Sequence, residues 1–337
     1  MLNFQDLPDE LVLKILSFLE IIDLNCCGQV SERFRRVSHD DTLWVTANLE
    51  KKTVKAELLE MILRKGCRTL NFSHSEIRGS LSSNIKSQLR FLTFTPIFSW
   101  GDSGEDTLFL EELLSSCSSL KHLIIERVCL TPKMADSVCK NGKTLQILNL
   151  NSSYVYFTPN NVEDIFKCCL ELKEIDLAHV NEKDGLSERK LELLAQNISP
   201  NVEKLYLNSS LIMDDQVKTL LRRCNKIKEL SLEATWLTDN SLKNIRQYLN
   251  LTLEELSLGP DDRDAISMEH YERFFLNTNT IHWRQANPPR ISFTGFLELK
   301  FMPRLKILNL YYEKDNGEEI QNLRHHLPNL MIKGVLN

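Results

Sequence analysis

The chain has 337 residues, of which 42% are apolar and 26% charged, a composition typical of a globular protein long enough for two domains or one extended repeat array. The formal net charge is −5, and its 41 basic and 46 acidic residues form no Lys/Arg block, which argues against nucleic acid as a partner. No stretch reaches the roughly 18 to 20 apolar residues that span a bilayer, which argues against a membrane protein.

The N-terminus carries acidic residues at positions where a secretory signal would carry basic ones. Asp6, Asp9 and Glu10 all fall within the first ten residues. We therefore expect the chain to remain on the reducing side of the cell, in the cytoplasm, the nucleus or both. The nine cysteines are then expected to be free thiols.

The first 45 residues predict three short helices. A helix over 10–19 follows Pro8 and places Leu11, Ile15 and Leu19 on one stripe. Two more helices are predicted over 22–30 and 32–37, before the sequence HDDTLW leads into the rest of the chain. A segment of this size is too small for a sufficient core of its own. The apolar stripe therefore needs cover, either from a partner or from the segment that follows.

A second pattern, apolar-x-x-apolar-x-apolar, recurs through the remainder of the chain. It begins at residues 44, 67, 89, 120, 145, 172, 202, 227, 253, 305 and 327. The double interval between 253 and 305 predicts a further copy at TNTIHW, from Thr278. Because side chains alternate along a strand, the fourth and sixth residues share one face, and the third and fifth point the other way. Each copy therefore predicts a short strand with one buried face.

Helical patterns lie between these strands. Leu242, Ile245 and Leu249 follow helical spacing, and Thr131-Pro132 supplies a helix cap followed by a proline at the first helical position. A strand-plus-helix unit cannot cover its own apolar side, so such units are stable only when stacked. We predict an α/β fold: three N-terminal helices over 1–45, then a leucine-rich-repeat solenoid over 46–337, a horseshoe with a parallel sheet on its concave face.

Neither the cysteines nor any catalytic motif in the sequence indicates a metal site or an enzymatic activity. Cys117, Cys169 and Cys224 each stand three residues before a strand motif, which predicts a buried packing position in the repeat rather than a metal ligand. The sequence has no glycine-rich phosphate loop, Gly-x-Ser-x-Gly or His-Glu-x-x-His motif. We expect no metal, no cofactor and no catalytic group.

The N-terminal sequence LPDELVLKILSFLEIIDLNCCGQVSERFRRVSHDDTLW resembles an F-box, the adaptor-binding motif of SCF ubiquitin ligases. It departs from the common pattern at Arg33-Phe34, where Arg-Trp is usual, and retains an aromatic residue there. The resemblance implies contacts with the SCF adaptor subunit at a set of mainly apolar residues: Leu7, Pro8, Leu11, Ile15, Leu16, Leu19, Leu24, Val30, Phe34, Leu43 and Trp44.

An F-box followed directly by repeats is similar to the F-box and leucine-rich-repeat substrate receptors. The resemblance implies a non-catalytic ligase subunit that reaches the cullin and RING subunits through the adaptor and presents a protein substrate for ubiquitination and proteasomal degradation. The alternative is a leucine-rich-repeat scaffold or inhibitor whose N-terminal helices only cap the solenoid, as the end of a repeat array requires.

The substrate is expected on the concave face, where the third, fifth and seventh positions of each motif point. These positions are acidic in the middle coils and basic or aromatic in the later ones. Because aromatic residues and arginine dominate interface energies and charges provide complementarity, we predict substrate contacts within one set: Tyr206, Glu233, Trp236, Glu255, His282, Arg284 and Tyr311.

Overall fold

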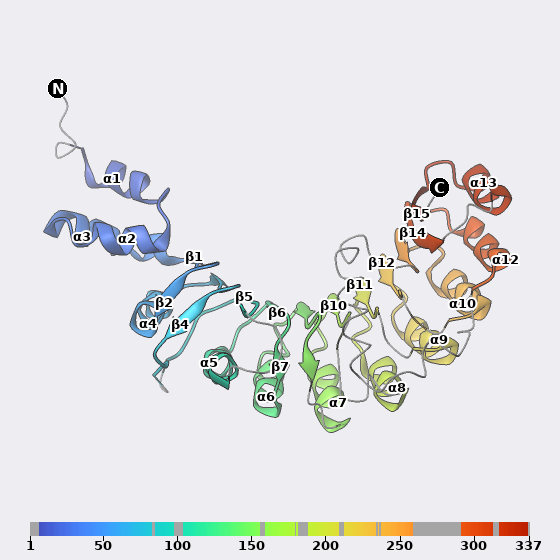
Figure 1. Cartoon of the computed structure of the whole chain (residues 1–337), viewed down its shortest axis with the longest axis horizontal. Coiled ribbons are helices and arrows are strands. Elements are labelled where there is room, and N and C mark those ends of the chain that lie inside the picture. Colours follow the sequence, from blue (N-terminus) through green and yellow to red (C-terminus); the bar gives the residue numbers. More distant parts are fainter. Residues whose placement is uncertain are drawn as a thin grey trace.

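A computed structural model gives the structure of the chain (Figure 1). It describes residues 7–335 apart from 83–84, 98–103, 156–158, 179, 181–187, 209–211, 234, 236, 259–290 and 313–316. Three helices at the N-terminal end precede a long arc of strands and helices. Within the described residues, no helix is both long and apolar enough to cross a membrane.

The N-terminal helices are α1 (Asp9–Leu16), α2 (Ile21–Cys27) and α3 (Glu32–Ser38), followed by a 3₁₀-helix over Asp41–Trp44. Helix α1 ends three residues before the predicted position. Phe18 N–H donates to the Ile15 carbonyl at 3.2 Å and Leu19 N–H to the Leu16 carbonyl at 3.0 Å, so the last turn tightens to i→i+3 bonding. Leu19 therefore lies in the turn that leads to α2.

Within the described residues, eleven strands form one sheet in which every neighbouring pair is parallel. Along the arc these strands are β1 (Thr46–Asn48), β3 (Thr69–Asn71), β5 (Phe91–Phe94), β6 (His122–Ile125), β8 (Ile147–Asn149), β10 (Glu174–Asp176), β11 (Lys204–Tyr206), β12 (Glu229–Ser231), β13 (Glu255–Ser257), β14 (Ile307–Tyr312) and β15 (Met331–Val335). The first ten strands each begin at the third residue of a predicted motif. The last strand, β15, is displaced from the motif predicted over 327–332, because Ile332 and not Leu330 stands opposite Leu308. Two shorter parallel pairs join β2 (Thr53–Lys55) to β4 (Glu76–Arg78) and β7 (Cys129–Leu130) to β9 (Tyr154–Val155).

Helices line the outer side of the arc and the large sheet lines its inner side (Figure 1). They are α4 (Ala56–Arg64), α5 (Gly104–Ser115), α6 (Pro132–Lys140), α7 (Pro159–Cys168), α8 (Glu188–Asn197), α9 (Asp214–Arg223), α10 (Asp239–Leu249), α12 (Phe293–Phe296), a 3₁₀-helix over Leu297–Phe301, and α13 (Gly317–His326). Thr131 caps α6 by accepting a bond from Met134 N–H at 3.3 Å. The predicted solenoid with a parallel sheet on its concave face is confirmed.

The core follows the predicted alternation. In β8, Leu148 is buried and its neighbours Ile147 and Asn149 are half-buried on the concave side. Leu242 and Ile245 of α10 close the core from behind the sheet. Because each coil buries its apolar side against the next, one continuous core runs from the N-terminal helices to β15.

The additional repeat predicted near residue 278 is absent from the sheet. Strands β13 and β14 pair directly, with Leu256 opposite Leu308 and Leu258 N–H donating to the Asn309 carbonyl at 2.9 Å. No strand can stand between them, so this prediction is wrong. A pattern of six residues at 278–283 is too short to distinguish a further repeat from a longer connection. Residues 278–283 themselves lie outside the described part of the chain.

The repeated cysteines are buried thiols, as predicted. Cys117, Cys169 and Cys224 are buried and unbridged. The Cys117 thiol donates to the Leu113 carbonyl and the Cys224 thiol to the Ser199 carbonyl, both at 3.3 Å. Burial raises the pKa of Cys224 to about 12, which keeps it a neutral packing group.

Candidate functional site

The three N-terminal helices share a small core that uses one face of α1. Val12 and Leu16 of α1 are buried together with Leu24 of α2 and Val37 of α3. These residues leave the adjoining side of α1, which begins with Leu11 and Ile15, without cover from the described chain.

That uncovered side carries four large apolar side chains, which we call the apolar ridge: Leu11, Ile15, Phe18 and Leu19. Their exposed fractions are 51%, 42%, 78% and 37%. Leu11, Ile15 and Phe18 follow i, i+4, i+7 spacing, so the stripe continues into the turn after α1. Clustered exposed apolar residues of this kind mark interaction surfaces. Phe18 was not among the predicted contacts, although the same spacing identifies it.

Three of the predicted adaptor contacts belong to the protein's own core instead. Leu16, Leu24 and Trp44 are 2%, 2% and 0% exposed, so their side chains cannot reach a partner, and the prediction for them is wrong. The physical reason is that an apolar periodicity identifies both faces of a short helix without showing which face the chain itself covers.

The remaining predicted contacts lie at or near the surface. Leu7, Phe34 and Leu43 are half-buried and pack against the core. Pro8, at the start of α1, is exposed, as is Val30 in the connection between α2 and α3. Adaptor contact at these positions, and at Leu11, Ile15 and Leu19, stays a prediction.

An ion-pair cluster sets the orientation of α1 on α3. Arg33 Nε donates to Asp9 Oδ1 at 2.9 Å, and the same guanidinium donates to the Leu7 carbonyl. Arg36 pairs with the second oxygen of Asp9. The bond from Arg33 is the main reason that the pKa of the Asp9 carboxyl lies below its usual value. Arg33 therefore holds the start of α1, and with it the apolar ridge, in place.

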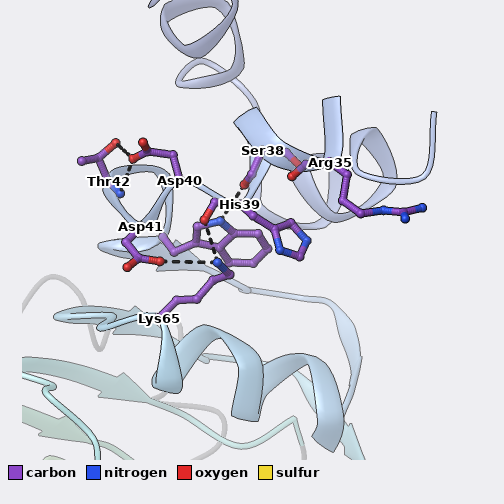
Figure 2. A network of polar contacts seen from close by, with 8 residues as sticks. Arg35, Ser38, His39, Asp40, Asp41, Thr42 and Lys65 are labelled. Atoms are coloured by element: carbon purple, nitrogen blue, oxygen red, sulfur yellow. Dashed lines mark hydrogen bonds and ion pairs between the residues drawn. The ribbon is translucent and has the colours of Figure 1, made fainter. Parts of the chain in front are cut away.

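A second cluster joins the N-terminal helices to the first coil (Figure 2). Trp44 is fully buried, and its indole Nε1–H donates to the Ser38 carbonyl at 2.8 Å. Lys65, at the end of α4, donates to the His39 carbonyl at 2.7 Å and pairs with Asp41 at 3.4 Å, as Figure 2 shows. The Lys65 ammonium also lies 5.5 Å from the centroid of the Trp44 ring. The helices and the solenoid are thus joined by packed and hydrogen-bonded side chains.

The concave face holds a hydrogen-bonded cluster at one predicted substrate position. Tyr206 donates its hydroxyl to Glu229 Oε2 at 2.7 Å, and Lys204 pairs with Glu229 Oε1 at 2.8 Å. Burial, followed by the bond to Glu229, raises the pKa of Tyr206, so the phenol stays neutral. Glu255 is half-buried and accepts a bond from Asn309 Nδ2 at 3.3 Å. The charge of Glu229 is therefore already compensated within the protein, and Glu255 has a hydrogen-bond partner.

The other predicted substrate contacts are either buried, described by their backbone alone, or outside the described residues. Glu233 is only 4% exposed, and its backbone N–H donates to Asn208 Oδ1 at 3.2 Å; its side chain offers a substrate almost no surface, so its prediction as a contact is wrong. Tyr311 belongs to β14, and the structure describes its backbone alone. Trp236, His282 and Arg284 lie outside the described residues.

Comparison with known proteins identifies the N-terminal segment. A family described as F-box-like matches residues 4–50, the segment that contains α1, α2, α3, the 3₁₀-helix with Trp44, and β1. Among solved structures, the chain is similar to the one described as the crystal structure of the Rad7 and Elc1 complex in yeast. The sequence identity is 17% and the TM-score 0.44, over 96% of this chain and 86% of that chain.

Proposed function

We propose that this protein is a substrate-recognition subunit of an SCF-type ubiquitin ligase. In this proposal, the F-box-like segment binds the small adaptor subunit, the adaptor connects it to the cullin and RING subunits, and the repeats bind a protein substrate. The carrying observation is the apolar ridge, which lies exposed within the segment that matches the F-box-like family.

The ridge is large enough to contribute substantially to binding. Complete burial of a Leu, Ile or Phe side chain stabilises by roughly 1.5–3 kcal/mol relative to full exposure. Scaled by the exposed fractions of its four side chains, burial of the ridge corresponds to about 3–6 kcal/mol. A helix face with such spacing suits a partner with an apolar groove.

The cluster of Trp44 and Lys65 that joins the N-terminal helices to the first coil supports the same proposal. A substrate receptor acts by placing a lysine of its cargo near a conjugating enzyme, and catalysis by proximity falls steeply with misplacement. The contacts of Trp44 and Lys65 couple the ridge to the first coil and thereby to the sheet. No catalytic group is required of this chain. As part of this proposal, the order of an F-box followed directly by repeats resembles that of the S-phase-kinase-associated F-box protein.

The decisive experiment is copurification of the adaptor with the full chain carrying Leu11→Asp and Ile15→Asp. We expect at least a hundredfold loss of affinity, because the variant removes much of the ridge and adds two charges to the interface. Leu170→Asp with Leu251→Asp is the matched control, since these leucines are 50% and 64% exposed on other coils.

Circular dichroism of both variants checks that the repeats remain folded. Adaptor binding by Leu11→Asp/Ile15→Asp at the strength of the unmodified chain would refute the proposal. The alternative, a scaffold whose helices merely cap the solenoid, requires the stripe to be covered by the first coil, whereas the ridge is exposed.

A further inference from the structure

One residue per coil, immediately before each strand from β3 to β14 of the large sheet, forms a continuous row along one edge of the sheet, which we call the edge row. In chain order it contains Arg68, Arg90, Lys121, Gln146, Lys173, Glu203, Lys228, Glu254 and Lys306. Its members stack directly. The Arg68 carbonyl accepts from Arg90 N–H at 2.8 Å, the Arg90 carbonyl accepts from Lys121 N–H at 2.7 Å, and the same bonding continues to Lys306. Their side chains therefore project from neighbouring coils about 4.8 Å apart.

The far half of the edge row is electrically compensated. Lys228 pairs with Glu203 and Lys306 pairs with Glu254, each at 2.6 Å. These bonds are the main reason that the pKa values of both glutamates lie below their usual range. Opposite charges on adjacent strands stabilise a sheet, so this half has an evident structural role.

The half nearest the N-terminal helices is not compensated. Arg68, Arg90 and Lys121 are three consecutive cations, and in the described part of the chain none of them forms an ion pair. Like charges directly opposite each other destabilise a sheet. The whole chain carries a net charge of −5, so this local excess of positive charge is not a consequence of composition. We call these three residues the basic edge.

An apolar surface adjoins the basic edge on the concave face. Phe91 and His122 follow Arg90 and Lys121 directly, and Ile147 belongs to the next coil; the three lie in register on β5, β6 and β8 and are half-buried. The Phe91 and His122 rings meet edge to face with centroids 4.6 Å apart. Burial, followed by the charge of Lys121, lowers the pKa of His122, which keeps the imidazole neutral. Cations on the rim thus stand beside aromatic and aliphatic side chains.

We propose that the basic edge and its adjoining apolar surface bind an extended segment of a partner protein that is rich in Asp and Glu and carries interspersed apolar residues. Carboxylates would bind Arg68 and Arg90 in two-point contacts and Lys121 as a point charge. Apolar side chains of the segment would cover Phe91 and Ile147. The statement that this segment belongs to the substrate rests on the proposed function. The binding of the segment to the basic edge does not depend on that function.

The repeat pattern did not predict this surface. Arg68, Arg90 and Lys121 occupy the second position of their motifs, and the pattern specifies no residue type at that position. The edge row places three cations from separate coils side by side, although they are 22 and 31 residues apart in the chain. The stacking bonds that bring them together belong to the folded solenoid.

The test is fluorescence anisotropy of the full chain with a labelled twelve-residue peptide built from repeated Asp-Glu-Phe. We expect binding that weakens as salt is raised, because exposed charges are screened. The variant Arg68→Glu/Arg90→Glu/Lys121→Glu should lower the affinity at least tenfold. The control Lys226→Glu/Lys228→Glu/Lys306→Glu changes the net charge equally in the far coils and should leave affinity within twofold.

Three outcomes would overturn the proposal. The first is that both triple variants weaken binding of the Asp-Glu-Phe peptide equally. The second is that a matching Lys-Arg-Phe peptide binds as tightly or more tightly. The third is that a twelve-nucleotide single strand binds more tightly than the peptide and depends on the same three cations. Adaptor copurification is measured on the same proteins. A chain that binds the peptide without adaptor refutes only the proposed function, and a chain that binds adaptor without the peptide refutes only this inference.

Discussion

Replacement of Trp44 tests whether this residue is the core of the joint between the N-terminal helices and the solenoid. Trp44 is 0% exposed, and its Nε1–H satisfies the Ser38 carbonyl at 2.8 Å. Truncation of a buried tryptophan to alanine costs about 3–5 kcal/mol. Loss of the hydrogen bond adds about 1 kcal/mol. We therefore expect Trp44→Ala to lower the free energy of unfolding by about 4–6 kcal/mol, a large fraction of the stability of a typical domain.

Trp44→Phe separates the two contributions. It retains an aromatic ring in the core and removes the donor to Ser38, so we expect a loss of about 1–3 kcal/mol. Because Trp44 offers no surface to a partner, the Trp44→Phe variant should still bind adaptor within about threefold, whereas a direct contact residue would lose much more.

Urea unfolding followed by circular dichroism gives the free energies, and hydrogen exchange locates the loss. In a solenoid each coil contacts mainly its neighbours, so amides of α1–α3 should lose protection while those of β10–β13 keep it. The reasoning is refuted if Trp44→Ala costs less than about 1 kcal/mol, or if protection falls evenly along the arc.

Two further predictions concern polar contacts. The pKa of Asp9 is lowered in the folded state by Arg33, so this carboxylate contributes stability above its unfolded pKa of about 3.9, and the contribution disappears as pH falls through the lower folded value. Stability measured from pH 5 to pH 2 should therefore fall less in Asp9→Asn than in the unmodified chain, and parallel curves would contradict this. Asn141 is buried, accepts from Leu120 N–H at 2.9 Å and donates to the Cys117 carbonyl at 3.2 Å, bridging two coils. Asn141→Ala leaves both groups unpaired and should cost about 2–4 kcal/mol in urea unfolding, against less than about 0.5 kcal/mol for the exposed control Asn240→Ala.

The amino-acid sequence alone determined the repeat, the strand positions and the helical caps, because these follow from local backbone geometry. Leu148 and Leu150 are apolar at an interval of two because strand side chains alternate, and Leu242 and Ile245 follow helical spacing because a turn has 3.6 residues. Such periods are visible without any knowledge of the neighbouring coil. The F-box resemblance was visible for the same reason, since its residues are contiguous.

Only the tertiary structure decided which apolar residues the chain covers and which charges it leaves uncompensated. Leu11 and Leu16 belong to one helix, yet Leu16 is buried and Leu11 is exposed, because the neighbouring α2 and α3 cover one side of α1. The direct pairing of β13 with β14, and the juxtaposition of Arg68 with Arg90, depend on residues 52 and 22 positions apart. Burial and electrostatic compensation are properties of these long-range contacts, so a pattern read along one segment cannot determine them.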